Sequence, residues 1–148
     1  MRYRDDLLSD IQYAMLECGA ELVVAESMTA GLLQSTIASR SGCGKYFRGG
    51  LTAYTLEDKV RFLQVNRDLA GQCQCVSAEV AQQMAKGALS FFDGFHRTAG
   101  VKWSIATTGY AEPDPDRDIR QEAYIALARS TETAGTLVLG FDHITLKG

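Results

Sequence analysis

The chain has 148 residues and a mass of 16.1 kDa, with 46% hydrophobic residues, a net charge of -3 and a pI of about 5.3. This size predicts one domain with an ordinary hydrophobic core. The acidic balance argues against a nucleic-acid-binding protein, and no apolar run approaches the roughly 18 residues of a membrane span. The charged N-terminus has no apolar segment behind it, so we expect no secretory signal and a cytoplasmic location.

Helical and strand patterns alternate in the first part of the chain. Apolar residues recur at helical spacing over 4–18, and a short buried strand is predicted at 21–25. Ser27 and Thr29 are both suited to cap a following helix, which is predicted to run to about Arg40.

A second strand is predicted at 51–54. Residues 55–58 have the form of a capping box, in which a hydroxyl precedes an acid by three residues, and the helix they open should end near Val65. Residues 66–74 are interpreted as a polar connection, and a long amphipathic helix is predicted over 77–92.

The last part of the chain is predicted to be mostly strands. A third strand is expected at 101–107, a charged loop with both prolines at 110–120, and two further strands at 122–129 and 136–141. Two strand–helix passes followed by a terminal hairpin predict a mixed sheet covered by helices.

The four cysteines are Cys18, Cys43, Cys73 and Cys75. The Cys-x-Cys pair has no second pair at ligand-like spacing and no histidine near it in the sequence, so we expect no metal site. Reduced, mostly structural thiols are the better interpretation for a cytoplasmic protein.

Two turns from strand to helix carry hydroxyl groups. The first is Ala-Glu-Ser-Met-Thr-Ala-Gly at 25–31, and the second runs over 49–59 and ends in Lys59. Such turns point backbone N–H groups and the positive end of a helix at a ligand above the sheet edge. The two turns and the lysine therefore suggest a pocket for an anionic small molecule.

Several motifs occur together in the order typical of one family. They are Ala-Glu-Ser-x-Thr-x-Gly at 25–31, Phe-x-Gly-Gly at 47–50, Tyr54 with Glu57 and Lys59, Val-Ser at 76–77 opening a helix, and a glycine turn after the third strand. This combination resembles the CinA C-terminal domain over nearly the whole chain. The resemblance implies a three-layer α/β/α fold with a mixed sheet of about five strands, and it implies homo-oligomers. In active members it also implies nicotinamide mononucleotide amidohydrolase activity, which needs no cofactor.

The chemistry of an amide hydrolase fits these residues in outline, because a nucleophilic hydroxyl needs a nearby base. Lys59 is the expected base if burial lowers its pKa, with Ser27 and Thr29 in the pocket and Tyr54 in an orienting role. The helix start at 29–31 would suit the nucleotide phosphate.

The pocket is completed by Gly31, Thr107 and Thr108 as expected substrate-binding residues. Each of these side chains also has a plainer interpretation. Ser27 and Thr29 could be simple helix caps, Lys59 a solvated lysine, Tyr54 a core strand residue, and Thr107 and Thr108 ordinary strand residues.

Three features depart from the family pattern. The family's turn after the second helix usually reads Gly-Ser-Ser, and its second serine is the expected nucleophile; here the turn is Gly-Cys-Gly at 42–44, which leaves Cys43 as a substitute. The loop over 110–118 is bulky and acidic rather than glycine-rich, and acids repel a phosphate. The family's final helix and its arginine are expected to be missing after 140–143.

Two hypotheses follow. The first is an amidohydrolase of weak or degenerate activity that binds a nicotinamide nucleotide. The second is a non-catalytic, oligomeric binding or interaction module, a pseudoenzyme whose pocket is narrowed or filled by Tyr110.

Overall fold

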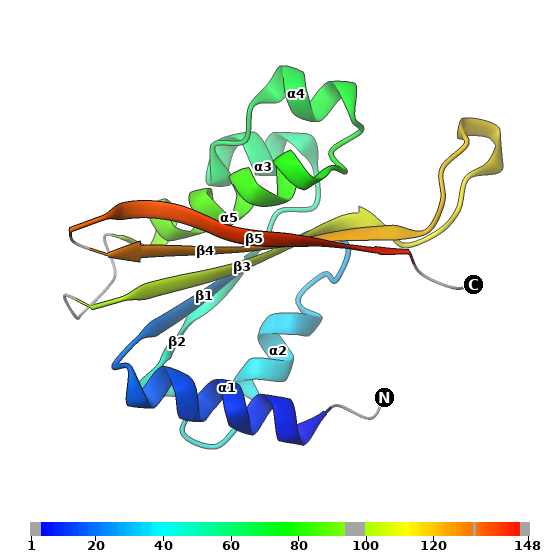
Figure 1. The fold of residues 1–148 in the computed structure, drawn as a ribbon. Helices are drawn as coiled ribbons and strands as arrows, with labels where there is room; N and C mark the ends of the chain where they lie inside the picture. The colour runs from blue at the N-terminus through cyan, green and yellow to red at the C-terminus, as the bar shows by residue number, and fades with distance from the viewer. Residues whose placement is uncertain (1–3, 94–99, 132, 146–148) are drawn as a thin grey trace.

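A computed structural model describes residues 4–93, 100–131 and 133–145. Five strands form one mixed sheet in the order β2-β1-β3-β4-β5 (Figure 1). The strands are β1 (Glu21–Glu26), β2 (Phe47–Thr52), β3 (Lys102–Tyr110), β4 (Glu122–Thr131) and β5 (Gly135–Thr145). β1 pairs in parallel with both β2 and β3, whereas β3, β4 and β5 are antiparallel.

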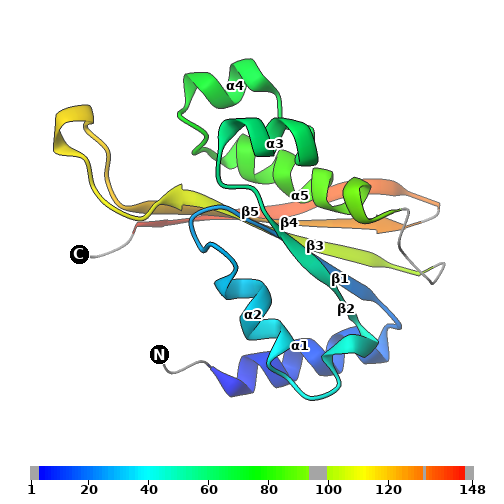
Figure 2. The same ribbon diagram turned by 180° about the vertical axis from the view of Figure 1, so that it is seen from behind.

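Helices cover both faces of this sheet, so the predicted three-layer α/β fold with a mixed sheet is confirmed (Figures 1 and 2). On one face α5 packs against β3, β4 and β5, with α3 and α4 beyond it, and on the other face α1 and α2 lie below β1 and β2. The helices are α1 (Asp5–Glu17), α2 (Leu32–Ala38), α3 (Leu56–Leu63), α4 (Arg67–Gln72) and α5 (Ala78–Asp93), with short 3-10 turns η1 (Cys43–Lys45) and η2 (Pro115–Arg117).

The two faces of the sheet carry separate apolar clusters because side chains alternate along each strand. Val23 and Ala25 of β1 join the larger cluster beneath α5, while Leu22 and Val24 join a smaller cluster with Ile37 of α2. All six residues of β1 are buried. The central strand is therefore covered on both sides, as parallel strands in α/β proteins usually are.

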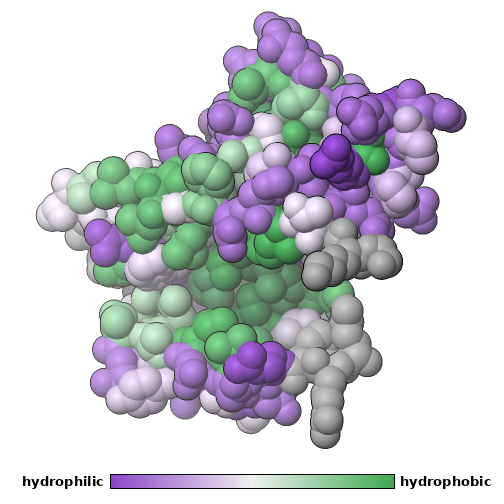
Figure 3. Space-filling model, turned by 45° about the vertical axis from the view of Figure 1, so that its right-hand side comes forward, coloured by the Kyte–Doolittle hydropathy of each residue, from purple (hydrophilic) through white to green (hydrophobic). Residues whose placement is uncertain are grey.

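β5 forms one edge of the sheet and is less well covered. Its exposed apolar side chains are Leu137, Leu139, Phe141 and Ile144. Figure 3 shows hydrophobic side chains gathered in a hollow in the middle of one face of the molecule. Among the described helices, none combines the length and the apolar character that a bilayer crossing requires.

β2 begins four residues earlier than predicted. The glycine pair at 49–50 was interpreted as a turn, but Gly49 and Gly50 pair with Val23 and Val24 of β1. A Cβ atom at Gly50 would lie 2.5 Å from Val24 Cγ2 and 2.8 Å from Gln34 Oε1. The glycine is therefore needed because side chains of β1 and α2 lie close to this strand, not because the chain turns.

The polar connection predicted at 66–74 was wrong, since it contains the short helix α4. Asn66 caps this helix by accepting a 2.9 Å hydrogen bond from the N–H of Leu69, and Ala70 is buried against α5 and its neighbours. A six-residue helix with one buried residue leaves almost no periodic signal in the sequence.

The start of α3 confirms the predicted capping box. Thr55 Oγ1 accepts from the N–H of Asp58 at 3.1 Å, and the Asp58 carboxylate accepts from the N–H of Thr55 at 3.4 Å.

The expected cap of α2 was wrong, because neither Ser27 nor Thr29 caps this helix. α2 begins only at Leu32, after a turn over 27–31.

We predict that Gly87→Ala destabilises the protein, because α5 touches the end of α3 at this glycine. A Cβ atom at Gly87 would lie 1.9 Å from the carbonyl oxygen of Leu63, so the helices must separate. We expect a loss of about 1–3 kcal/mol in the free energy of unfolding, measured by urea denaturation.

Gly71→Ala is the matched control, since a Cβ atom at Gly71 of α4 meets nothing within 4 Å. Alanine there should leave the stability unchanged or raise it slightly, because glycine is a poor helix former. Equal stability of the two variants would show that the α3–α5 contact is not tight.

Candidate active site

Ser27 and Lys59 come together above the end of β1. Ser27 directly follows β1, and its N–H donates to the carbonyl of Thr107 on β3 at 3.0 Å. Lys59 lies on α3, and Ala53, in the segment that joins β2 to α3, donates its N–H to the carbonyl of Glu26 at 2.8 Å. Two turns far apart in the sequence are thus fixed to the same end of the sheet, where β1 and β2 finish.

The Lys59 amine is buried and hydrogen-bonded to three oxygen atoms. The side chain is 1% exposed, and Nζ lies 2.9 Å from Ser27 Oγ, 3.0 Å from the Ala53 carbonyl and 3.1 Å from the Tyr54 carbonyl. Among the described residues, no carboxylate forms an ion pair with this amine. Burial therefore lowers the pKa of Lys59, opposed in part by the nearby Cys75 and Asp58.

This arrangement suits both protonation states of Lys59. A charged ammonium group has three N–H donors for the three oxygen atoms. A neutral amine has two N–H donors, which the carbonyls of Ala53 and Tyr54 can accept, and one lone pair that faces the hydroxyl of Ser27. The neutral amine can therefore take the proton of Ser27 without any rearrangement.

Glu26 is the site residue that sequence reasoning missed. It is the last residue of β1 and fully buried, and its carboxylate accepts hydrogen bonds from the N–H groups of Gly31 at 3.1 Å, Leu33 at 3.0 Å and Gln34 at 2.8 Å. It therefore caps α2 from outside the turn. An acid immediately before a strand-to-helix turn was the available signal, but capping rules look for the cap next to the helix.

This contact takes up several donors of the phosphate site expected at 29–31, which stays a prediction. The N–H groups that should hold the phosphate at Gly31 and the start of α2 already donate to the Glu26 carboxylate. A second anion would find fewer donors there and would be repelled by Glu26.

The three threonines hold the walls of the site together. Thr29 Oγ1 and Thr107 Oγ1 lie 2.8 Å apart, so the first turn is joined to β3. Thr108 is buried, and its hydroxyl donates to the carbonyl of Cys75 at 2.8 Å, which joins the segment between α4 and α5 to the same strand. The hydroxyl groups of all three threonines thus form hydrogen bonds within the protein.

Two of the expected catalytic side chains do not reach Lys59. The side chain of Tyr54 is 64% exposed, and only its carbonyl contacts the amine. Cys43 lies in η1, just before the start of β2, and its thiol donates to the carbonyl of Ala38 at 3.3 Å. The start of β2 pairs with the start of β1, so about 16 Å of strand separates Cys43 from Ser27.

The remaining cysteines form no metal site or disulfide in the described structure. All four are free thiols, and the described residues contain no group of three or more His, Cys, Asp or Glu residues that could hold a metal ion. Burial raises the pKa of the Cys75 thiol, which favours its protonated form.

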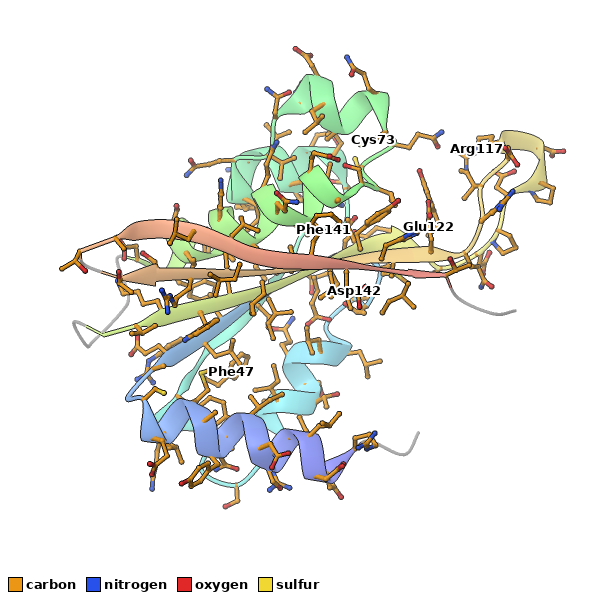
Figure 4. All side chains as sticks on the ribbon, viewed as in Figure 1. Phe47, Cys73, Arg117, Glu122, Phe141 and Asp142 are labelled. Atoms are coloured by element: carbon orange, nitrogen blue, oxygen red, sulfur yellow. The ribbon has the colours of Figure 1, made fainter. Side chains whose placement is uncertain are left out.

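A pocket of about 310 Å³ opens at the same end of the sheet, beside the last residue of β3. It lies between the α4–α5 connection and the loop that joins β3 to β4, and Figure 4 shows Cys73, Arg117 and Glu122 on its walls. Tyr110 lines this pocket and donates from its hydroxyl to the Cys73 carbonyl at 3.4 Å. Ser27 and Lys59 are not among the residues that line this pocket, so the narrowing of the Lys59 site by Tyr110 stays a prediction.

The acidic loop is partly neutralised by its own arginine. Arg117 Nε lies 2.5 Å from the Asp114 carboxylate, and Arg117 Nη1 donates to Gln74 Oε1 at 3.2 Å. The hydrogen bond from Arg117 lowers the pKa of Asp114. On the opposite wall the Glu122 carboxylate lies 2.7 Å from the ring of His143. Arg120 lines the pocket as a second cation.

Comparison with known proteins places this geometry in a family. A family model described as the CinA C-terminal domain matches residues 4–138. The chain belongs to the CinA family. A CinA-like protein of Shewanella baltica is 35% identical over 125 residues, which are 84% of this chain and 28% of that protein. The nicotinamide-nucleotide amidohydrolase PncC of Shewanella oneidensis is 32% identical over 127 residues, 86% of this chain and 28% of that protein.

Solved structures of CinA proteins share the fold. The competence damage-inducible protein A of Klebsiella pneumoniae has a TM-score of 0.77 at 22% identity, covering 97% of this chain and 82% of that one. A CinA superfamily protein of Escherichia coli also has a TM-score of 0.77, at 23% identity, with 100% and 82% covered. The chain thus spans most of these solved structures but about 28% of the length of the curated relatives.

We predict that stability depends on pH through Lys59. Its pKa is lowered in the folded state, so between that value and the ordinary lysine pKa of about 10.4 the unfolded chain binds more protons. The free energy of unfolding of the wild type should therefore rise with pH across this window, relative to Lys59→Met. Urea denaturation at several pH values measures this difference.

Lys86→Met serves as the control, because Lys86 is exposed on α5. Its stability should follow that of the wild type at every pH. A constant difference between wild type and Lys59→Met would contradict a lowered pKa for Lys59.

Proposed function

We propose that this CinA-family chain hydrolyses a carboxamide, with Ser27 as the nucleophile and Lys59 as its base. The observation that carries the proposal is the 2.9 Å contact between Ser27 Oγ and a buried amine with a lowered pKa. A nucleophile and a base within hydrogen-bond reach are the general requirement for such catalysis. The nucleophile therefore need not be replaced by Cys43.

The reaction follows from these two groups. Neutral Lys59 takes the hydroxyl proton as Ser27 Oγ attacks the carbonyl carbon, and the resulting ammonium group returns a proton to the departing ammonia. A water molecule then loses a proton to Lys59 and attacks the acyl-serine ester. This step releases the carboxylic acid and restores Ser27.

The turn after β1 also offers donors for the negative oxygen of the tetrahedral intermediate. Among the described residues, the backbone N–H groups of Met28 and Thr29 have no hydrogen-bond partner in the structure. They are the first and second residues after Ser27. Backbone N–H groups so placed can stabilise an oxyanion, an effect usually worth several kcal/mol in other hydrolases.

The substrate we propose is a nicotinamide nucleotide. The similarity to a Shewanella oneidensis protein named nicotinamide-nucleotide amidohydrolase supports this class. Because Glu26 closes the start of α2, the phosphate would bind Arg117 and Arg120 in the neighbouring pocket. Tyr110 on its wall lies three residues, about 10 Å of strand, beyond Thr107, which suits the length of a nucleotide.

A non-catalytic binding module is the alternative. It is favoured by the burial of the pair, since Ser27 is only 6% exposed and Lys59 only 1% exposed. A substrate can reach Ser27 only if a side chain that covers it moves aside. Both proposals include a homo-oligomer in the cytoplasm, and light scattering of the pure protein tests the oligomer.

We predict that purified protein releases ammonia from nicotinamide mononucleotide and that Ser27→Ala or Lys59→Met lowers kcat by roughly a thousandfold or more. The rate should rise with pH as Lys59 loses its proton, because only the neutral amine is a base. Cys43→Ser is the control and should keep wild-type activity. No turnover at any pH, with thermal-shift binding retained, would favour the binding module.

Arg120→Ala tests the proposed phosphate contact. We expect KM for the nucleotide to rise about tenfold, the loss of one charge-assisted hydrogen bond, with little change in kcat. Arg61→Ala, an exposed arginine outside the pocket, is the control. An unchanged KM would remove Arg120 from the site.

A further inference from the structure

We propose that Glu26 is a positioning residue that holds the turn carrying Ser27 so that its hydroxyl meets the Lys59 amine. The inference rests on the proposed role of Ser27 as the nucleophile. Glu26 does not touch the reacting atoms. It acts through the backbone on both sides of Ser27.

The first part of the argument is the way Glu26 spans the turn. Its own carbonyl accepts the N–H of Ala53, which fixes its backbone beside β2. Its carboxylate reaches over the turn to the N–H groups of Gly31, Leu33 and Gln34. Residues 27–30 therefore lie between the backbone of Glu26 and Gly31, and Glu26 fixes both ends.

The second part is the strain of the turn. Ala30 has a φ angle of 49° and Gly31 has a φ angle of 101°, so two successive residues are in the left-handed half of the backbone map. A non-glycine residue in this region is strained, because its Cβ lies too close to the following carbonyl oxygen. Within the turn the N–H of Ala30 donates to the Ser27 carbonyl at 3.0 Å and the N–H of Leu32 to the Thr29 carbonyl at 2.9 Å, and Thr29 is joined to Thr107, but these contacts do not tie Gly31 to the end of β1. The three bonds to Glu26 stabilise the strained conformation.

The third part is chemical. Every partner of the Glu26 side chain is an N–H donor, so the site needs two acceptor oxygen atoms. In Glu26→Gln the amide NH₂ must face an N–H group, and one of these donors is left unpaired in a buried place. In Glu26→Asp the carboxylate is retained but is one methylene shorter and cannot reach all three donors.

Loss of an ordinary helix cap would disturb less of the structure than loss of Glu26. α3 and α4 have caps directly before their first residue, so loss of Asn66 Oδ1 affects only the start of α4. The cap of α2 comes from the other side of the turn. Its loss frees the turn together with the helix start, and Ser27 lies in between.

The test compares Glu26→Gln with the cap variant Asn66→Ala. Covalent labelling of Ser27 by a fluorophosphonate probe is followed by mass spectrometry, well below the Tm of each variant. We expect Glu26→Gln to be labelled at least tenfold more slowly than the wild type. Asn66→Ala should lower Tm but be labelled at the wild-type rate. Labelling of Glu26→Gln at the wild-type rate overturns the inference.

A second variant covers the case in which Glu26→Gln does not fold. Glu26→Asp keeps the charge, and because its carboxylate is withdrawn it should also be labelled at least threefold more slowly. Wild-type labelling of a folded Glu26→Asp protein overturns the inference equally.

A second measurement separates this inference from the proposed function. If Ser27 of the wild type is not labelled at all, the nucleophile assignment fails, and the Lys59 pKa is then measured by NMR. A loosened turn admits water, so this pKa should rise toward the ordinary value in Glu26→Gln and stay at the wild-type value in Asn66→Ala. An unchanged pKa in Glu26→Gln shows that Glu26 does not position the contact.

Discussion

The burial of one amine determines how this edge of the molecule is built. Lys59 is removed from water without a carboxylate partner among the described residues, so three oxygen atoms must be brought to it. Two of them are carbonyls of the chain leading into α3, and the capping box of Thr55 and Asp58 fixes that chain. The third is the hydroxyl of Ser27, which depends on β1 and on Glu26. The turn after β1 and the segment before α3 therefore both supply oxygen atoms to a single nitrogen atom.

Much of this architecture could be predicted from the sequence, because the signals are local. The capping box at Thr55 identified the start of α3, and the apolar pattern identified β1 and α5. The meeting of Ser27 with Lys59 was expected only loosely, from two turns at one sheet edge. The exact partners of a buried side chain depend on contacts between distant segments, which no spacing rule contains.

The errors have the same origin. Gly50 was interpreted as part of a turn, whereas it lies in β2 and the side chains of Val24 and Gln34 leave no room for a Cβ atom there. Glu26 was overlooked as a cap because it lies five residues before Gly31, on the far side of a turn. Cys43 was considered as a nucleophile by its place in a motif, but strand pairing puts it at the opposite end of the sheet. In each case the tertiary arrangement decided what the local pattern left open.

The position of β1 has a consequence for how the molecule can move. This strand lies between two parallel neighbours, and all six of its residues are buried, so its amide protons exchange with solvent only when the sheet itself opens. Ser27 is fastened to this rigid base, whereas the loop between β3 and β4 is largely exposed and contacts the 72–76 segment through Arg117 and Tyr110. The reactive group and the wall of the pocket thus belong to parts of the protein with very different opening free energies. Changes in the loop can alter what enters the site while leaving the cooperative unit beneath it intact.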